Sequence, residues 1–452
     1  MIPNKKQIRK EIYCLILPII LENVFQVSAS LISIAMIGRL TAIDISSQGL
    51  CMRITETLNS LFRGIAIGAT VYIARSYGEG NKHKCFNIFK QTILSTVPLS
   101  ILCGAVLFAT PLTFLSFLTK DPVILAKGQD YMRIVVCGLP FVSIMAIVTS
   151  TFQGHSNTRV PMYIAMLVNV VNMGLGYVLI FGIFGFEGLG INGAGLALVI
   201  AQGVGALTGV CLLFSKKMNI FSIEQLKEKL FKYDFKCIKE VYSTGVPAAF
   251  ESVFWQLSAI VMSKAIMTFG ETSFAAYQIG IQAESITEMP AMGFGIAATA
   301  LSAKAIGMRD DILFKNYFKE LVKSCFTISI VTSLLLILLP NVFMSAMTDK
   351  AEIQVIGAVY VFVMGFVQIP QNLSRIYNGT IRAAGYKNAP MLISGTGIWL
   401  IRIPLALLVT YVFKLDIFFI WLCIVVDQFT RFALSIILFK RKKINDTVLN
   451  MN

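Results

Sequence analysis

The sequence predicts an all-α protein that crosses a membrane twelve times, and three observations support this fold class. Of the 452 residues, 56% are apolar and only 14% are charged, and the mean hydropathy is +0.74. Because soluble domains carry about 25% charged residues, a soluble globular protein is excluded. The apolar residues form runs of the length that a bilayer span needs, which is about 20 residues. The third observation is an internal repeat.

Twelve apolar segments are long enough to cross the bilayer. The first follows a basic N-terminus and has no small-residue cleavage site, so we expect a membrane helix and not a signal peptide. An even number of crossings places both termini on the same side. The expected spans are residues 12–38, 45–74, 87–117, 124–152, 161–185, 190–215, 240–269, 275–303, 320–346, 353–381, 390–413 and 417–439.

The chain is basic, with 39 Lys and Arg against 24 Asp and Glu, a net charge of +15. In a soluble protein this excess would suggest nucleic acid as partner. Here the basic residues lie mainly between apolar runs, at the N-terminus, in alternate loops and at 440–443. Since cytoplasmic loops carry an excess of Lys and Arg, we expect both termini in the cytoplasm, a location in the bacterial inner (plasma) membrane, and no nucleic-acid partner.

The internal repeat has a constant shift of 229 residues. Pro18 and Glu22, for example, recur as Pro247 and Glu251. Two units of six helices have the same orientation in the bilayer, so a pseudo-two-fold axis along the membrane normal should relate them. The predicted domains are an N-lobe (1–215), a cytoplasmic linker (216–239) and a C-lobe (240–452). An amphipathic stretch around 223–231 should place the linker at the headgroup surface.

Carboxylates inside the spans are the first functional candidates, because an ionisable group at a helix centre costs about 2.5–3.5 kcal/mol on insertion scales. Three prolines in the same helices are candidate hinges, because proline removes a helical hydrogen bond. An oxygen-rich set of this kind suits protons, sodium or an organic cation. The hinges are Pro18, Pro247 and Pro290, and the candidate site residues are Glu22, Gln26, Glu251, Gln256, Tyr277, Gln282, Glu284, Glu288 and Arg375.

Some intramembrane charges have simpler interpretations. We expect Glu56 to pair with Arg53 or Arg63 in the second span, and Asp427 to pair with Arg431 one helical turn away. These pairs would be structural. Glu288 has an equal claim to a structural pair with a nearby base.

Glu251 and Glu284 have no evident local partner, which favours a functional role. Lys264, Arg375 and Arg402 are the basic residues expected to balance the C-lobe carboxylates. Of these, Arg375 lies in a polar run of its helix.

Several enzyme motifs do not occur in the sequence. There is no phosphate-binding G-x-x-x-x-G-K-[ST] loop and no H-E-x-x-H sequence. The two histidines lie in connections, where we expect surface positions, and the nine cysteines include no C-x-x-C pair. We therefore expect neither an enzyme nor a cofactor, no firm metal site and no disulfide framework. The energy for transport would then come from an ion gradient.

The residues of the expected seventh and eighth spans carry a family resemblance. The Pro247-x-x-x-Glu251 spacing, Tyr277 with its neighbours, Glu284 with the following serine and the Met-Pro at Pro290 together resemble the signature of multidrug and toxic compound extrusion (MATE) transporters. The resemblance implies a V-shaped pair of lobes that alternates access and exports cationic, lipophilic compounds in exchange for protons or sodium.

The resemblance also implies roles for single residues. Glu251 and Glu284 match the C-lobe carboxylates of the DinF-like branch, and Arg375 matches an assisting basic residue of the tenth helix. Two positions depart from other members: residues 31–34 lack the first-helix aspartate, and residues 368–372 lack the acidic residue of NorM-like members. We therefore expect a DinF-like rather than a NorM-like transporter, with more weight on Glu22.

The sequence as a whole predicts a secondary active multidrug antiporter, expected to be a monomer, with coupling carried by Glu251 and Glu284. If sodium is the coupling ion, these two carboxylates are its expected ligands. The alternative from the same superfamily is a flippase for lipid-linked precursors, which needs a cationic cleft, whereas the N-lobe offers only Arg53 and Arg63. A membrane-embedded transferase or protease lacks a recognisable nucleophile and base. A passive channel lacks a continuous polar helix face.

Overall fold

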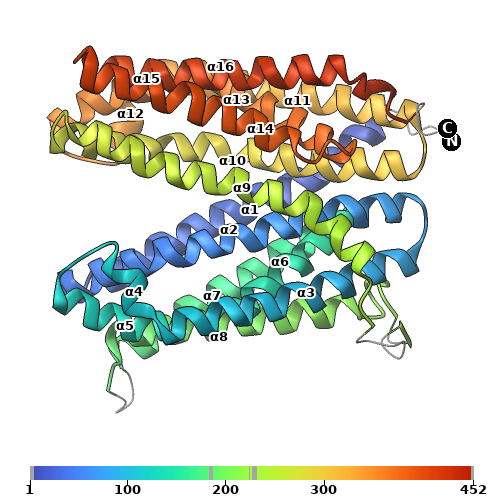
Figure 1. Ribbon diagram of the computed structural model, residues 1–452, viewed down its shortest axis with the longest axis horizontal. Helices are drawn as coiled ribbons and strands as arrows, with labels where there is room; N and C mark the ends of the chain where they lie inside the picture. The colour runs from blue at the N-terminus through green and yellow to red at the C-terminus, as the bar shows by residue number, and fades with distance from the viewer. Residues whose placement is uncertain (1–4, 183–186, 223, 226–231, 449–452) are drawn as a thin grey trace. The chain divides into compact units, whose positions relative to one another are not determined.

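The computed structural model describes residues 5–182, 187–222, 224–225 and 232–448. Within these ranges every regular element is helical (Figure 1). The chain divides into two compact units. Unit 1 contains Met1–Ile20 and Phe250–Asn452, and unit 2 contains Leu21–Ala249. Helices α1 (Lys5–Ile37) and α9 (Phe235–Met267) each belong to both units.

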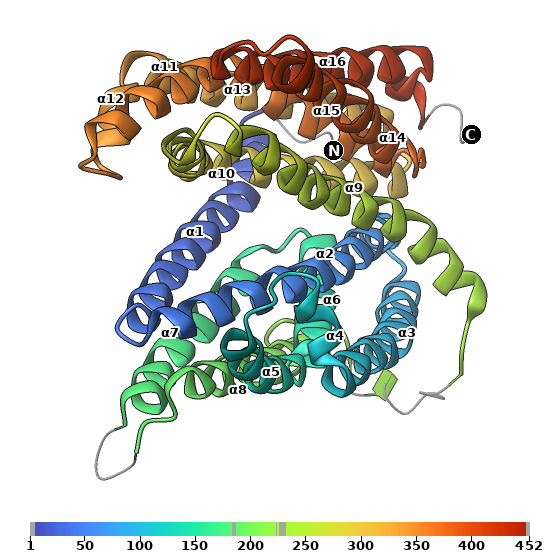
Figure 2. The same cartoon turned by 60° about the vertical axis from the view of Figure 1, so that its left-hand side comes forward.

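Unit 2 is a helical bundle in which α2 packs against α3, α5 and α6, and α7 packs against α8 (Figure 2). Local sequence signals set where its helices begin. Thr41 and Asp44 form a capping box at the start of α2, and Asp121 caps α5 ahead of a first-turn proline. Besides parts of α1 and α9, unit 2 contains α2 (Ala42–Gly78), α3 (Lys82–Ala109), α4 (Pro111–Ser116), α5 (Pro122–Val136), α6 (Leu139–Gly154), α7 (Arg159–Phe181) and α8 (Gly190–Leu213).

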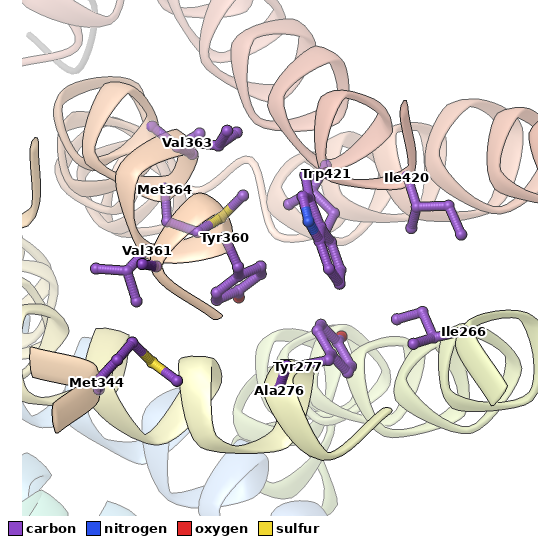
Figure 3. Close-up of a cluster of buried hydrophobic side chains, with 14 of the residues drawn as sticks. Ile266, Ala276, Tyr277, Met344, Tyr360, Val361, Val363, Met364, Ile420 and Trp421 are labelled. Carbon is purple, nitrogen blue, oxygen red and sulfur yellow. The ribbon is translucent and has the colours of Figure 1, made fainter. Parts of the chain in front are cut away.

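Unit 1 is organised around α13 (Ala351–Ala383), which packs against α10, α11 and α16. Its core includes an aromatic cluster in which Tyr277 and Trp421 stack with ring centroids 5.5 Å apart (Figure 3). Tyr360 meets both rings edge-on. The other elements of unit 1 are α10 (Glu271–Gly307), α11 (Asp311–Leu338), α12 (Pro340–Ser345), α14 (Ala389–Gly395), α15 (Ile403–Leu407) and α16 (Ile417–Arg441).

The helix boundaries repeat along the chain with the shift found in the sequence. The bounds of α2, α3 and α4 move onto those of α10, α11 and α12 when 229 is added to each residue number. The boundaries between the compact units obey the same rule, because Ala249 lies 229 residues after Ile20. These three helices therefore have the same bounds in both halves, whereas α13 is continuous where the first half has α5 and α6.

The number of spans differs from the expected twelve. Ten described helices are long and apolar enough to cross a membrane, and the bent pair α5 and α6, with an angle of 44°, makes eleven. The expected second span forms α2, a helix of 37 residues, but it is too polar to meet the same criterion. Its polar residues line a cavity, as described below.

Four expected spans are divided into shorter pieces, and the fourth of the twelve is the bent pair α5 and α6. The third and ninth end in separate short helices, α4 and α12, each beginning at a proline. The eleventh contains two π-helical turns, Thr396–Arg402 and Leu408–Val412, which flank α15. π-Helical turns are rare and occur frequently at functional sites.

Both ends of the described chain contact the start of α11. Arg9 donates to Glu320 at 2.7 Å, and Asp446 lies 3.5 Å from Lys315. The beginning of α1 and the turn after α16 therefore lie at the same end of unit 1. The expected amphipathic stretch around 223–231 lies almost wholly outside the described residues.

Candidate functional site

Glu251 on α9 is held by a guanidinium that the sequence did not suggest. Arg382 Nη2, in the last turn of α13, lies 2.7 Å from Glu251 Oε2, and the Ser394 hydroxyl donates to Oε1 at 3.2 Å. In the described chain Glu251 has no local partner, as expected, and the basic residues expected to balance it, Lys264, Arg375 and Arg402, did not include Arg382. Arg382 is 131 residues away in sequence.

Glu284 on α10 has a neutral partner. The Tyr360 hydroxyl donates to Glu284 Oε2 at 2.7 Å, from within the aromatic cluster of Figure 3. Glu284 makes no ion pair within the described ranges. It therefore differs from Glu251, whose charge is balanced by direct contact with an arginine.

Glu288, one turn further along α10, forms an ion pair with Arg375. Gln371 Nε2 also donates to Glu288 Oε1 at 2.8 Å. The pairing with a nearby base, weighed as the structural alternative, is thus the observed arrangement.

Asp427 on α16 is fully buried and lies between two arginines. Arg431 Nε is 2.9 Å from Oδ1, which confirms the expected intrahelical pair, and Arg402 Nη2 is 2.6 Å from Oδ2. Arg402 ends the first π-helical turn and balances Asp427 rather than a glutamate. The Trp255 ring lies 4.8 Å from the Arg402 guanidinium carbon and 5.3 Å from that of Arg431.

Eight charged side chains inside unit 1, four carboxylates and four guanidinium groups, carry no net charge together. Arg382 pairs with Glu251, Arg375 with Glu288, and Arg402 and Arg431 with Asp427, whereas Glu284 pairs with no arginine of the described chain. Removing one partner of a buried pair such as those of Asp427 costs about 3–5 kcal/mol. A proton or cation that enters must therefore compete with an arginine or neutralise the one carboxylate without such a partner. The group consists of Glu251, Glu284, Glu288, Asp427, Arg375, Arg382, Arg402 and Arg431.

The remaining predicted residues of unit 1 lie around this group. Tyr277 is buried in the aromatic cluster, whereas Gln256, Gln282 and Lys264 are exposed on their helices. Pro290 lies inside α10, between Glu288 and the buried end of that helix.

Glu22 and Gln26 belong to unit 2, so the predicted site residues are divided between the units. Gln26 lines a cavity of about 370 Å³. Glu22 is half-buried on α1 and is not among the lining residues. Glu56 and Arg63 also line the cavity and pair at 2.8 Å, which confirms one of the two expected partners of Glu56.

The polar groups that line the cavity in unit 2 are mainly uncharged. Three buried amide atoms there, Asn59 Oδ1, Asn169 Nδ2 and Gln202 Oε1, have no hydrogen-bond partner within the described part of the chain. Such groups are usually satisfied by water or a ligand. The sequence analysis missed this amide set. Its signal is the recurrence of Asn and Gln inside the apolar spans: Gln48, Asn59, Asn169, Asn172 and Gln202.

These features define a polytopic helical membrane protein with polar sites inside two compact units, and its relatives are carriers. The MatE family model matches residues 18–178 and 247–408, and the chain belongs to this family. The two matched segments begin at Pro18 and Pro247, which are equivalent prolines of the repeat. The family resemblance proposed from the sequence is therefore confirmed.

The relatives and solved structures cover nearly the whole chain. The chain is 28% identical to "Probable multidrug resistance protein NorM" of Thermotoga maritima, over 96% of this chain and 92% of the relative. It is 24% identical to "Probable multidrug resistance protein YoeA" of Bacillus subtilis, over 96% and 93%. A MATE crystal structure in the bent conformation matches with a TM-score of 0.88 and 15% identity, covering 99% of each chain. The protein is thus a multidrug-type secondary transporter and not an enzyme.

Proposed function

We propose that this chain is an ion-coupled antiporter that exports cationic, lipophilic compounds in exchange for protons or sodium. The observation that carries the proposal is the balanced group of charges in unit 1. Glu284 is its only carboxylate without an arginine contact in the described chain, and Glu251 is held by Arg382. Glu284 would be the carboxylate that is neutralised, and Glu251 would be the carboxylate that exchanges its contact with Arg382 for a contact with the drug.

The proposed cycle uses competition for these carboxylates. A cationic drug approaching Glu251 would displace Arg382, and Ser394 would continue to donate to the carboxylate. Protonation of Glu284, or sodium bound at Glu251 and Glu284, would remove the negative charge that attracts the drug. Drug and coupling ion would then occupy the protein alternately, which is the requirement for exchange.

Alternating access would involve α1 and α9, because each runs from one unit into the other. Pro18 and Pro247 each lie two residues before a unit boundary and serve as the hinges, with Pro290 as a third inside α10. We propose that the repeat produces two six-helix lobes, 1–215 and 240–452, related by a pseudo-two-fold axis and joined by the linker 216–239.

The cavity in unit 2 would hold the uncharged polar part of a drug. Its unpartnered amide groups can donate and accept hydrogen bonds, and its only described ion pair is internal. The match of Glu251 and Glu284 and the absence of an acidic residue at 368–372 support a DinF-like protein, and Glu22 would provide the carboxylate of this half. We propose an inner-membrane monomer with both termini in the cytoplasm.

The flippase alternative is not favoured. A pyrophosphate headgroup needs several unpaired basic residues. The unit 2 cavity of about 370 Å³ is lined by one arginine of the described chain, Arg63, which already pairs with Glu56.

The test is ethidium efflux from proteoliposomes that contain the purified protein. A pH gradient and a sodium gradient are imposed separately, and empty liposomes give the background. Efflux above background under one gradient supports antiport and identifies the ion. Absence of gradient-driven efflux, together with movement of a fluorescent lipid-linked substrate, would support the flippase instead.

A further inference from the structure

A polar cavity of about 480 Å³ lies in unit 2 where the connection after residue 231 meets α3. It is found at the ends of two candidate spans, α3 and α9. These span ends place the cavity at the level of the lipid headgroups, whichever side of the membrane it faces. The lining residues are Asn87, Lys90, Gln91, Lys232, Tyr233, Asp234 and Phe235.

Hydrogen bonds hold the wall of this cavity in a defined position. Gln91 Nε2 donates to the Lys232 carbonyl at 2.7 Å, and the Asp234 backbone N–H donates to Gln91 Oε1 at 2.9 Å. Asn87 Nδ2 donates to Asp234 Oδ2 at 3.1 Å. One side chain of α3 thus fixes the backbone of the connection on both sides of Tyr233, so the cavity has a built wall.

The charges at the cavity favour an anion. Lys90 and Lys232 line it, and among the described lining residues Asp234 is the only acidic one. Asp234 is already engaged by Asn87 and by the backbone N–H of Cys237 at 3.1 Å. The whole connection 216–239 contains seven lysines and three acidic residues.

Two aromatic rings beside the cavity indicate contact with lipid. Tyr233 and Phe235 stack with centroids 6.2 Å apart, yet they remain 47% and 77% exposed. Aromatic rings are enriched at the headgroup level of membranes, where one part of the environment is apolar and another is wet. Free inorganic phosphate has no apolar part that would use these rings.

We propose that this cavity binds the headgroup of an anionic phospholipid, with Lys90 and Lys232 contacting the phosphate and Tyr233 and Phe235 packing against the adjoining lipid. Neither the proposed transport cycle nor the family comparison assigns a site here. If the termini are cytoplasmic as proposed, the cavity faces the cytoplasmic leaflet, where a surface lysine contributes about 1 kcal/mol to binding of anionic lipid. The proposal does not depend on drug transport.

The test measures binding of dioctanoyl phosphatidylglycerol to the detergent-purified full chain, read as the concentration dependence of its thermal unfolding temperature. Dioctanoyl phosphatidylcholine and inorganic phosphate are the comparison ligands. We expect phosphatidylglycerol alone to stabilise the wild type. The Lys90→Gln, Lys232→Gln double variant should bind it about thirtyfold more weakly.

Three further variants make the result specific. Lys350→Gln with Lys414→Gln removes the same charge at two exposed positions far along the chain and should bind like the wild type. Lys90→Arg with Lys232→Arg keeps both positive charges and should bind phosphatidylglycerol like the wild type. This variant shows that substitution at the two positions does not by itself weaken binding. Tyr233→Ala with Phe235→Ala should weaken phosphatidylglycerol binding.

Two outcomes would overturn the proposal. Equal weakening in the cavity variant and the distant lysine variant would mean that net charge, and not this cavity, attracts the lipid. Equal stabilisation by inorganic phosphate, with no effect of the aromatic variant, would mean that the cavity takes free phosphate instead.

Discussion

Glu251 and Glu284 are balanced in different ways, and this difference sets their roles in the proposed cycle. Glu251 contacts Arg382 and Ser394, whereas Glu284 accepts a hydrogen bond from Tyr360. A hydrogen bond to a charged group contributes about 1.5–3 kcal/mol. The hydrogen bond from Tyr360 to Glu284 is therefore strong enough to affect transport, and a single substitution can remove it.

Tyr360→Phe should reduce gradient-driven ethidium efflux about tenfold or more, because it removes the hydrogen bond to Glu284 and little else. Initial efflux rates in proteoliposomes measure this. Tyr411→Phe, at an exposed position of unit 1, is the matched control and should transport like the wild type. Equal rates in both variants would exclude a role for Tyr360 in coupling.

Gly397→Ala should destabilise the protein by about 1–3 kcal/mol, because the added methyl group would overlap Asp427 and Arg431. Gly174 on α7 is the control position, since an added Cβ meets nothing within 4 Å there. Alanine at that helical site should be neutral or slightly stabilising. Thermal unfolding of the purified variants compares them, and a similar unfolding temperature for both would contradict the tight packing at Gly397.

Sequence spacing predicted contacts within one helix but not contacts between helices. Asp427 with Arg431, and Glu56 with Arg63, were predictable because side chains one or two turns apart share a helix face. The contact of Arg382 with Glu251 depends on how α13 packs in unit 1. No local pattern carries that information.

At the scale of elements, the start of α9 is fixed by one aspartate. Asp234 precedes the helix, accepts the Cys237 backbone N–H and is held by Asn87. The backbone hydrogen bond, followed by that of Asn87, lowers the pKa of the Asp234 carboxyl although partial burial opposes this. The native state therefore prefers the charged form.

This preference gives Asp234 a pH-dependent contribution to stability. The contribution is fully present above the ordinary pKa of an aspartate, about 4, and disappears as the pH falls through the lower native pKa. Asp234→Ala should lower stability by about 1 kcal/mol near neutral pH, as for other lost helix caps. The gap in unfolding temperature between wild type and variant should shrink at pH 3. A gap that is unchanged or larger at pH 3 would contradict this assignment.

Most helices were predictable because apolar runs and capping residues agree with each other along the sequence. The polarity of α2 could not be interpreted without the cavity that its polar residues line. The π-helical turn Thr396–Arg402 ends at Arg402, which pairs with Asp427 of α16, and this is again a contact between separate elements. Propensity alone does not indicate it.

At the scale of the whole molecule, the repeat includes an exchange of helix segments. Helix α1 begins in unit 1 and ends in unit 2, whereas α9 begins in unit 2 and ends in unit 1, with boundaries two residues after Pro18 and Pro247. Each proline removes one helical hydrogen bond at the place where the helix passes between units. Bending at these positions is therefore less costly than elsewhere in the same helices.

Pro247→Ala should slow efflux about two- to tenfold while leaving ethidium affinity unchanged, because the restored hydrogen bond of about 0.5–1.5 kcal/mol must break at each bend. Efflux turnover and equilibrium ethidium binding separate the two effects. A variant with normal turnover would remove Pro247 from the list of hinges.

The central claim is that carboxylates of unit 1 couple ion and drug movement, and one comparison tests it most directly. Gradient-driven ethidium efflux is measured in proteoliposomes with wild type, Glu251→Gln and Glu271→Gln, the last being an exposed first-turn residue of α10. All three proteins are checked for equal folding by size-exclusion chromatography. We predict that Glu251→Gln loses gradient-driven efflux and that Glu271→Gln keeps it. Full efflux by Glu251→Gln would contradict the account.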